Sequence, residues 1–160
     1  SGDADIPAYL DPWYAAGTEV VLACGGGIFT SAGQAAAKVG AKVIGVDVDQ
    51  AATIDGLYGE GMTVTSAMKG LAATVNAELQ AILDGTFEGG KVDNLGLVSD
   101  VPAENFVQIA PSTQFSDSFT EADYEALVAS MNAGDVVVSN DIAAEPAVSV
   151  VTVDYQGNIK

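Results

Sequence analysis

The segment Glu19–Gln50 constrains the fold of this chain more than any other part of the sequence. An apolar run, Val20–Cys24, leads into three consecutive glycines. Small residues over about Thr30–Val39 then lead into a second apolar run, Lys42–Val46. The two runs predict strands and the small-residue stretch predicts a helix. This order is a βαβ unit, so we predict an α/β fold with a binding crevice at the carboxyl ends of its strands.

Composition narrows the function. The chain has 160 residues, of which 49% are hydrophobic, enough for the core of one domain. Its 22 acidic residues face five lysines and no arginine, so the net charge of −17 disfavours nucleic acid and anionic membranes as partners. The absence of histidine removes the usual general base, the usual metal ligand and any Ser–His or Cys–His dyad.

The single cysteine, Cys24, ends an apolar strand and cannot form a disulfide within the chain. We predict a small buried residue there rather than a reactive thiol.

The sequence starts at Ser1 without a signal peptide and has no transmembrane run. We therefore expect a processed product or an excised domain, with any targeting segment upstream.

The remaining elements follow from periodicity and from turn residues. We predict a mostly parallel sheet flanked by helices over residues 1–160, a single Rossmann-like lobe without internal repeats. The expected elements outside the βαβ unit are a helix over Ile6–Gly17, a loop over Ala51–Gly61, a strand over Met62–Ser66, an amphipathic helix over Ser66–Asp84, strands over Lys91–Asp100 and Glu104–Ala110, a helix over Thr120–Gly134, and strands at Val136–Val138 and Val148–Val153.

The glycine run Gly25-Gly26-Gly27 admits three interpretations. A dinucleotide fingerprint G-x-G-x-x-G would need a glycine where Thr30 stands, although Asp47 lies where the ribose partner of a nicotinamide cofactor would be. The glycines could instead serve only the tight strand-to-helix turn. They could also let another ligand approach the backbone N–H groups closely.

Four side chains near this unit are candidates for ligand binding. Asp47 and Asp49 would share one side of an extended strand and could bind sugar hydroxyls, a metal or water. Without histidine, a transition metal is disfavoured. Lys69 is expected in the first turn of a helix, where a cation opposes the helix dipole, so it is either functional or simply solvent-exposed. Phe29 could stack on a planar ligand or staple the start of its helix.

Four segments together suggest a family. They are Ala23–Gly27 with the following helix, Val43–Gln50, Val64–Lys69 and the helix end Leu83–Gly90, and the closing Val153–Gly157 is also similar. This pattern resembles the basic membrane protein family, the nucleoside-binding lipoproteins that supply ABC transporters. The resemblance covers most of this chain but about half of a family member.

The resemblance implies a periplasmic-binding-protein-like lobe, the carboxyl-terminal one of two, with the ligand held between lobes. By motif position, Asp47 and Lys69 would hold the ribose hydroxyls of a nucleoside, with a purine base expected. The family motif GGTGxGVF is altered here, so Phe29 is a candidate for stacking on the base rather than a match. The implied protein is not an enzyme and carries no cofactor. Its partners are a membrane permease and the missing amino-terminal lobe, and it is extracytoplasmic and lipid-anchored.

Two alternatives remain open on the sequence. One is a Rossmann-type oxidoreductase domain that binds NAD through the glycine run and Asp47. The other is a ligand-sensing regulatory domain of similar fold.

Overall fold

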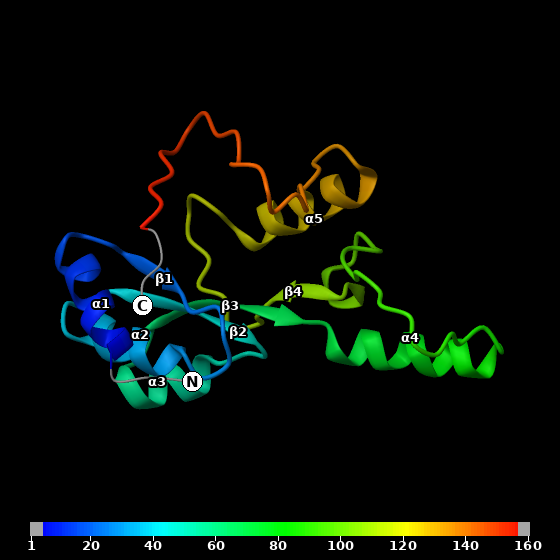
Figure 1. Ribbon diagram of the computed structural model, residues 1–160, viewed down its shortest axis with the longest axis horizontal. Coiled ribbons are helices and arrows are strands. Elements are labelled where there is room, and N and C mark those ends of the chain that lie inside the picture. The colour runs from blue at the N-terminus through cyan, green and yellow to red at the C-terminus, as the bar shows by residue number, and fades with distance from the viewer. Residues whose placement is uncertain (1–4, 157–160) are drawn as a thin grey trace.

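The computed structural model describes residues 5–156 and shows alternating helices and strands (Figure 1). The elements, in chain order, are α1 (Asp5–Ala15), β1 (Val20–Leu22), α2 (Phe29–Ala37), β2 (Lys42–Asp47), α3 (Ala51–Tyr58), β3 (Thr63–Lys69), α4 (Leu71–Leu83), the short 3-10 helix η1 (Pro102–Glu104), β4 (Val107–Ile109) and α5 (Glu121–Ala133).

The strands form one four-stranded sheet in the order β1-β2-β3-β4. β1 pairs with β2 and β2 with β3 in parallel, whereas β4 runs antiparallel to β3. The predicted βαβ unit is therefore confirmed, as is the α/β class with a mostly parallel sheet flanked by helices. The carboxyl ends of the three parallel strands lie at one edge, where a binding crevice is expected.

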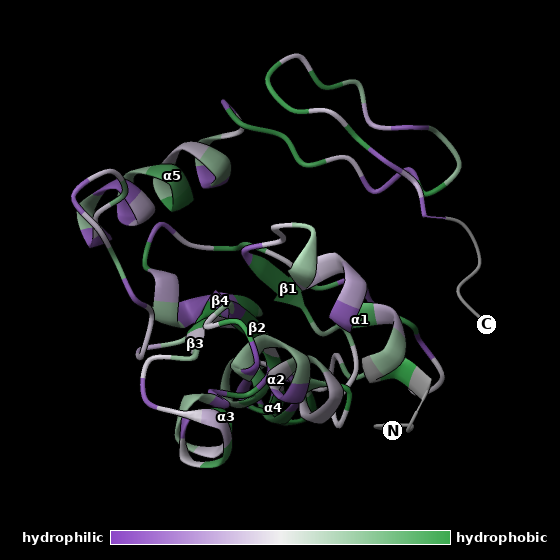
Figure 2. Cartoon of the chain, turned by 90° about the vertical axis from the view of Figure 1, so that its left-hand side faces the viewer, coloured by the Kyte–Doolittle hydropathy of each residue, from purple (hydrophilic) through white to green (hydrophobic). Residues whose placement is uncertain are grey.

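The core lies between the first three strands and the helices that pack on them. α2 and α3 lie on one side of the sheet, α1 packs on α2, and α5 lies on the other side (Figures 1 and 2). Alanines and a serine line the inner face of α2, so the helix approaches the sheet closely. The buried core residues are Leu10, Tyr14, Ala23, Ala32, Ala35, Ala36, Val43, Ile54 and Met62.

Tyr14 connects the first helix to the sheet. Its hydroxyl donates a hydrogen bond to the carbonyl oxygen of Lys42 at 2.9 Å, and its side chain is almost fully buried. Burial disfavours the phenolate, which raises the pKa of Tyr14 to about 12. Among the aromatic residues of α1, Tyr14 is buried and Trp13 is partly buried, whereas Tyr9 is exposed.

The loop expected over Ala51–Gly61 is instead the helix α3, Ala51–Tyr58. Its side chain Ile54 has no exposed surface and anchors the helix in the core. That burial outweighs the cost of Gly56 inside the helix. The glycine that ends the helix is Gly59, whose φ of 125° is accessible mainly to glycine.

The strand β3 extends further than predicted, and the helix after it starts later. Antiparallel pairing of Ala67–Lys69 with β4 carries the strand through Lys69. Gly70 follows because an added Cβ would lie 2.2 Å from the carbonyl oxygen of Asn105. The expected helix Ser66–Asp84 is therefore α4, Leu71–Leu83, and no residue of α4 is buried.

The second half of the chain has less regular structure than predicted. The strand expected over Lys91–Asp100 is irregular, and the next one is reduced to Val107–Ile109 with η1 before it. The segments Val136–Val138 and Val148–Val153 are exposed and form no strand within the described residues. No partner strand lies alongside them there to satisfy their backbone groups, so β propensity alone does not produce a sheet. The element order is consequently simpler than the one predicted.

The helix expected over Thr120–Gly134 is confirmed as α5. Thr120 caps it, with its hydroxyl accepting from the backbone N–H of Asp123, and the Asp123 carboxylate accepting from the N–H of Thr120. The hydrogen bonds that the carboxylate accepts from the N–H and the hydroxyl of Thr120 lower the pKa of Asp123. Among residues 5–156, none of the helices combines the length and apolar character needed to cross a bilayer.

Candidate functional site

A cavity of about 580 Å³ lies at the carboxyl ends of the parallel strands, and it brings together several of the predicted site residues. It is where the α/β topology places ligands. Its walls are mainly apolar, with one acid and one lysine among them. The lining residues are Leu22, Cys24, Gly25, Gly26, Val46, Asp47, Ala67, Met68, Lys69 and Val107.

Asp47 is the last residue of β2 and has an uncommon backbone conformation. Its φ is 71°, and it is the one non-glycine residue with positive φ among the described residues. Aspartate tolerates this region better than most residues, yet the conformation still costs on the order of 1 kcal/mol. Such strain clusters at binding sites, where the surrounding structure fixes a side chain in one direction.

Lys69 meets Asp47 across the paired strands β2 and β3. Its Nζ lies 2.8 Å from Asp47 Oδ1, and the two side chains are 67% and 41% exposed. The register that pairs Asp47 with Met68 places the two ends side by side. The expectation that Lys69 stands in a helical first turn is wrong, because it ends a strand. An ion pair this exposed adds less than about 1 kcal/mol to folding stability.

The glycine run forms the turn between β1 and α2. Gly25 has φ of 154°, and a Cβ there would lie 2.6 Å from Ile28 Cδ1, so a larger residue would strain the backbone and displace the Ile28 side chain. A Cβ on Gly26 would come within 3.9 Å of Asp47 Oδ2. The backbone of the run therefore borders the carboxylate of Asp47 directly, and the absence of side chains keeps the cavity open on that side.

Gln50 is a positioning residue that the sequence reasoning missed. Its amide Nε2 donates to the carbonyl oxygen of Gly26 at 3.2 Å, and its Oε1 accepts from the N–H of Val46 at 2.9 Å. Its own N–H donates to Ser66 Oγ. The side chain is thus buried between the glycine run and the ends of β2 and β3. Its place directly after the two aspartates was the available signal.

Three predicted site residues do not line the cavity. Gly27 lies one residue beyond the lining stretch, and its carbonyl oxygen accepts from the Thr30 hydroxyl. Phe29 is partly buried and packs against the hydrophobic core. Asp49 accepts hydrogen bonds from the N–H of Ala51 and the hydroxyl of Ser112, because β2 ends at Asp47 and strand alternation does not continue to Asp49.

The prediction for Cys24 is wrong. The sequence predicts a small buried residue, but the thiol is exposed and lines the cavity. The strand β1 ends at Leu22, and the chain turns at Cys24, whose N–H donates to the carbonyl oxygen of Leu22. The side chain therefore leaves the core that Ala23 enters.

The chemistry available at this site is recognition of a polar ligand. A carboxylate accepts hydrogen bonds, a neighbouring ammonium donates them, and such charge-assisted bonds are the strong ones. The apolar walls would contact the rest of the ligand. Over residues 5–156, no three His, Cys, Asp or Glu side chains are grouped so that they could hold a metal ion.

Comparison with known proteins agrees with this fold. Residues 10–130 match the model of the Bmp family, described as ABC transporter substrate-binding protein PnrA-like. The match covers most of the chain, which therefore belongs to this family of ABC transporter substrate-binding proteins. No curated protein matches the chain significantly.

A solved structure confirms the fold. It is the ABC transporter system solute-binding protein from Conexibacter woesei DSM 14684, with a TM-score of 0.60 and 23% sequence identity. The similarity covers 86% of this chain but 43% of that protein, so this chain spans less than half of its length. The fold is thus that of a periplasmic-binding-protein-like lobe.

Proposed function

We propose that residues 1–160 form one ligand-binding lobe, the carboxyl-terminal one, of a two-lobe solute-binding protein that serves an ABC transporter. Membership of the Bmp family supports this role, and the similar solute-binding protein is about twice as long. The protein would work outside the cytoplasm, anchored by a lipid. It would deliver its ligand to a membrane permease by closing its lobes.

The ligand we propose is a nucleoside, with a purine as the expected base. The observation that carries this proposal is the pair Asp47–Lys69, exposed at the mouth of the cavity and fixed on one side by a strained backbone. One group accepts hydrogen bonds and the other donates them, which suits the vicinal hydroxyls of ribose. Gly25 and Gly26 leave room for the sugar, and Phe29 and Asp49 would contribute only if lobe closure rearranged them.

Titration with adenosine and with inosine tests the proposal, using calorimetry on the full-length protein and NMR shifts on this chain. We expect Asp47→Ala to weaken binding by roughly 1.5–3 kcal/mol, the range for hydrogen bonds to a charged group. We expect this chain alone to bind weakly, because one lobe supplies half of the contacts. Deoxynucleosides that lack one hydroxyl of the diol should lose a similar amount.

Asp93→Ala is the matched control. Asp93 forms an exposed ion pair of the same kind with Lys91, 3.1 Å apart, away from the cavity. The control variant should bind like the unaltered protein. Unchanged affinity in Asp47→Ala would remove Asp47 from the site.

A second candidate function is NAD binding by a Rossmann-type domain. The observation in its favour is the strand–glycine–helix–strand unit with Asp47 at the end of β2. The same titration decides between the two. Shifts or fluorescence quenching produced by NAD but not by adenosine or inosine would favour the cofactor, and the reverse would exclude it. A third possibility is a ligand-sensing regulatory domain, for which the domains joined to this chain in its parent protein are the test.

A further inference from the structure

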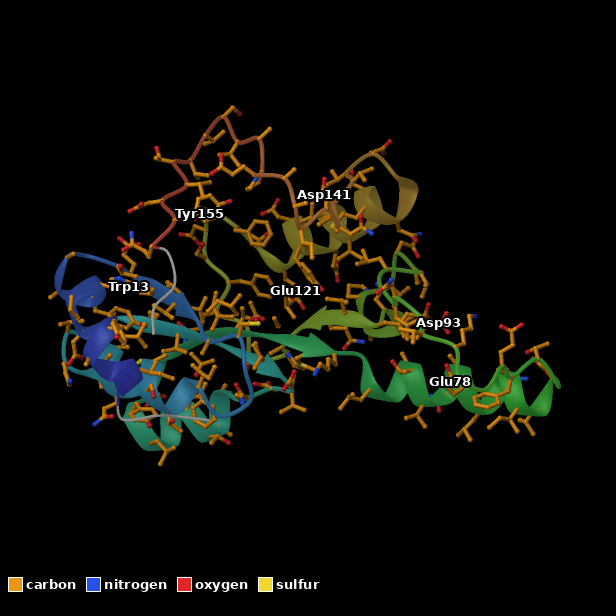
Figure 3. The ribbon with its side chains drawn as sticks, viewed as in Figure 1. Trp13, Glu78, Asp93, Glu121, Asp141 and Tyr155 are labelled. Carbon is orange, nitrogen blue, oxygen red and sulfur yellow. The ribbon has the colours of Figure 1, made fainter. Side chains whose placement is uncertain are left out.

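A second cavity, of about 320 Å³, lies between α5 and β4 and shares no residue with the Asp47–Lys69 cavity. α5 lies above β4 in both ribbon views, and Glu121 stands at the start of that helix, close to the strand (Figures 1, 2 and 3). The volume falls in the range of small-molecule sites. The lining residues are Val101, Pro102, Ala103, Gln108, Ile109, Ala110, Pro111, Phe115, Glu121, Tyr124 and Glu125.

Most of the wall is apolar, and two aromatic rings give it flat surfaces. The ring centroids of Phe115 and Tyr124 are 6.4 Å apart, at 37° to each other. Pro102 and Pro111 add two more rings from the segments on either side of β4. Such walls suit the apolar body of a ligand, and aromatic faces attract a cation placed over them.

The charged groups of the cavity are two carboxylates, which accept hydrogen bonds. Glu121 and Glu125 are four residues apart on α5 and therefore lie on the same side of the helix. The Gln108 amide nitrogen already donates to the carbonyl oxygens of Ala103 and Asn105, at 2.9 and 2.8 Å, which leaves its oxygen to offer. Among the described residues no lysine lines the cavity, so a ligand that satisfies the two carboxylates must donate hydrogen bonds.

Within residues 5–156, no lysine pairs with either of the two carboxylates. Every lysine among the described residues is engaged elsewhere: Lys38 with Asp11, Lys42 with the carbonyl oxygen of Gly61, Lys69 with Asp47, and Lys91 with Asp93. Two like charges four residues apart on a helix repel each other, and a cation beside them relieves that repulsion. The net charge of −17 adds a field that attracts cations to the whole surface.

We propose that this cavity is a second binding site, for a small organic cation with an ammonium group and an aromatic or branched apolar body. The ammonium lies against Glu121 and Glu125, and the body lies between Phe115, Tyr124 and the prolines. The site is independent of the nucleoside site proposed above, because neither its residues nor its ligand chemistry are shared.

Three probes of nearly equal shape separate charge from shape. The probes are phenethylammonium, 2-phenylethanol and phenylacetate, each titrated into the ¹⁵N-labelled chain while the backbone resonances of residues 101–125 are followed. We expect saturable shifts there with the ammonium, binding at least tenfold weaker with the alcohol, and none with the carboxylate. Equal affinity for the ammonium and the alcohol would overturn the proposal.

A charge-removing variant and its control complete the test. We expect the double variant Glu121→Gln, Glu125→Gln to bind phenethylammonium at least tenfold more weakly, and Phe115→Ala to bind it more weakly with both charges intact. The control Glu78→Gln, Glu88→Gln removes two exposed acids elsewhere and should bind normally. Equal loss in the control would reduce the effect to general attraction by net charge and would refute the site. Asp47→Ala should leave these titrations unchanged, so failure here and failure of the nucleoside proposal are distinguishable.

Discussion

The two halves of the described chain differ sharply in how much of their apolar surface they bury. Up to Lys69, ten hydrophobic residues are buried, whereas from Gly70 onward two are, Ala110 and Val128. Both halves are rich in valine and alanine, so composition does not account for the contrast. The two halves differ in topology. In the first half, consecutive strands are adjacent and parallel, and the helices that connect them pack back onto the sheet.

The second half instead displays its apolar residues. Along α4, the side chains Leu71, Val75, Leu79 and Ile82 are each more than half exposed, and the helix extends away from the sheet as an arm (Figure 1). The stretch beyond α5 contains several hydrophobic segments without regular structure (Figure 2). Stability therefore resides in the first half, and the Asp47–Lys69 pair stands at the border of that stable unit.

The largest expected effect on stability comes from a substitution in the core of the well-packed first half. Ile54 has no exposed surface, and truncation to alanine leaves a cavity beneath α3 that the surrounding side chains fill only in part. We expect Ile54→Ala to lower the free energy of unfolding by about 2–5 kcal/mol in urea titrations. Leu79→Ala is the matched control in the other half, where the side chain is 53% exposed. Its effect should stay within about 0.5 kcal/mol. Equal losses in both variants would contradict the contrast.

A pH titration sharpens the same contrast. The pKa of Tyr14 is raised to about 12 by burial, against about 10 in the unfolded chain. The unfolded state therefore loses its proton first. The contribution of Tyr14 to the free energy of unfolding is therefore fully present below pH 10 and is lost as the pH rises through 12. The total loss is on the order of 3 kcal/mol.

Tyr14→Phe should lose this pH dependence, although removal of the hydroxyl also costs about 1 kcal/mol at neutral pH, because the Lys42 carbonyl oxygen loses its partner. Tyr155→Phe, at a tyrosine that is 61% exposed in the second half, is the control and should keep it. Denaturant midpoints at pH 8, 10 and 11.5 measure the effect. A parallel decline in Tyr14→Phe and the unaltered chain would assign the loss to other groups.

The sequence predicted the elements whose signals are local. The strand–glycine–helix–strand order of Glu19–Gln50 needs only periodicity and a turn, and it was found correctly. The helix that follows Thr120 was also found, and the hydrogen bonds that cap it lie within four residues. The helix α3 was missed because the polar stretch Ala51–Gly61, with its three glycines, suggested a loop. The burial of Ile54, which decides the outcome, depends on residues elsewhere in the chain.

The candidate site shows the same division. Its location at the ends of β2 and β3 was predicted, because parallel strands bring their carboxyl ends together. That Lys69 ends a strand depends on pairing with Val107–Ile109, almost forty residues away. The left-handed conformation of Asp47 and the hydrogen bonds of Gln50 also depend on tertiary contacts. Periodicity contains no signal for any of these.

The smallest expected effect lies in the second half and concerns α5. Val128 is the buried residue of this helix, so the cap contributes a large share of the helix's local stability. We expect Thr120→Ala to cost about 1 kcal/mol and to speed amide hydrogen exchange in Glu121–Ala133, while exchange in β2 and α2 stays unchanged. Thr74→Ala is the control, since the Thr74 hydroxyl returns to the carbonyl oxygen of Gly70 within its own helix and caps no free N–H group. If the Thr120 variant accelerated exchange in β2 as strongly as in α5, the two halves would unfold as one unit, and the contrast in burial would not correspond to a contrast in local stability.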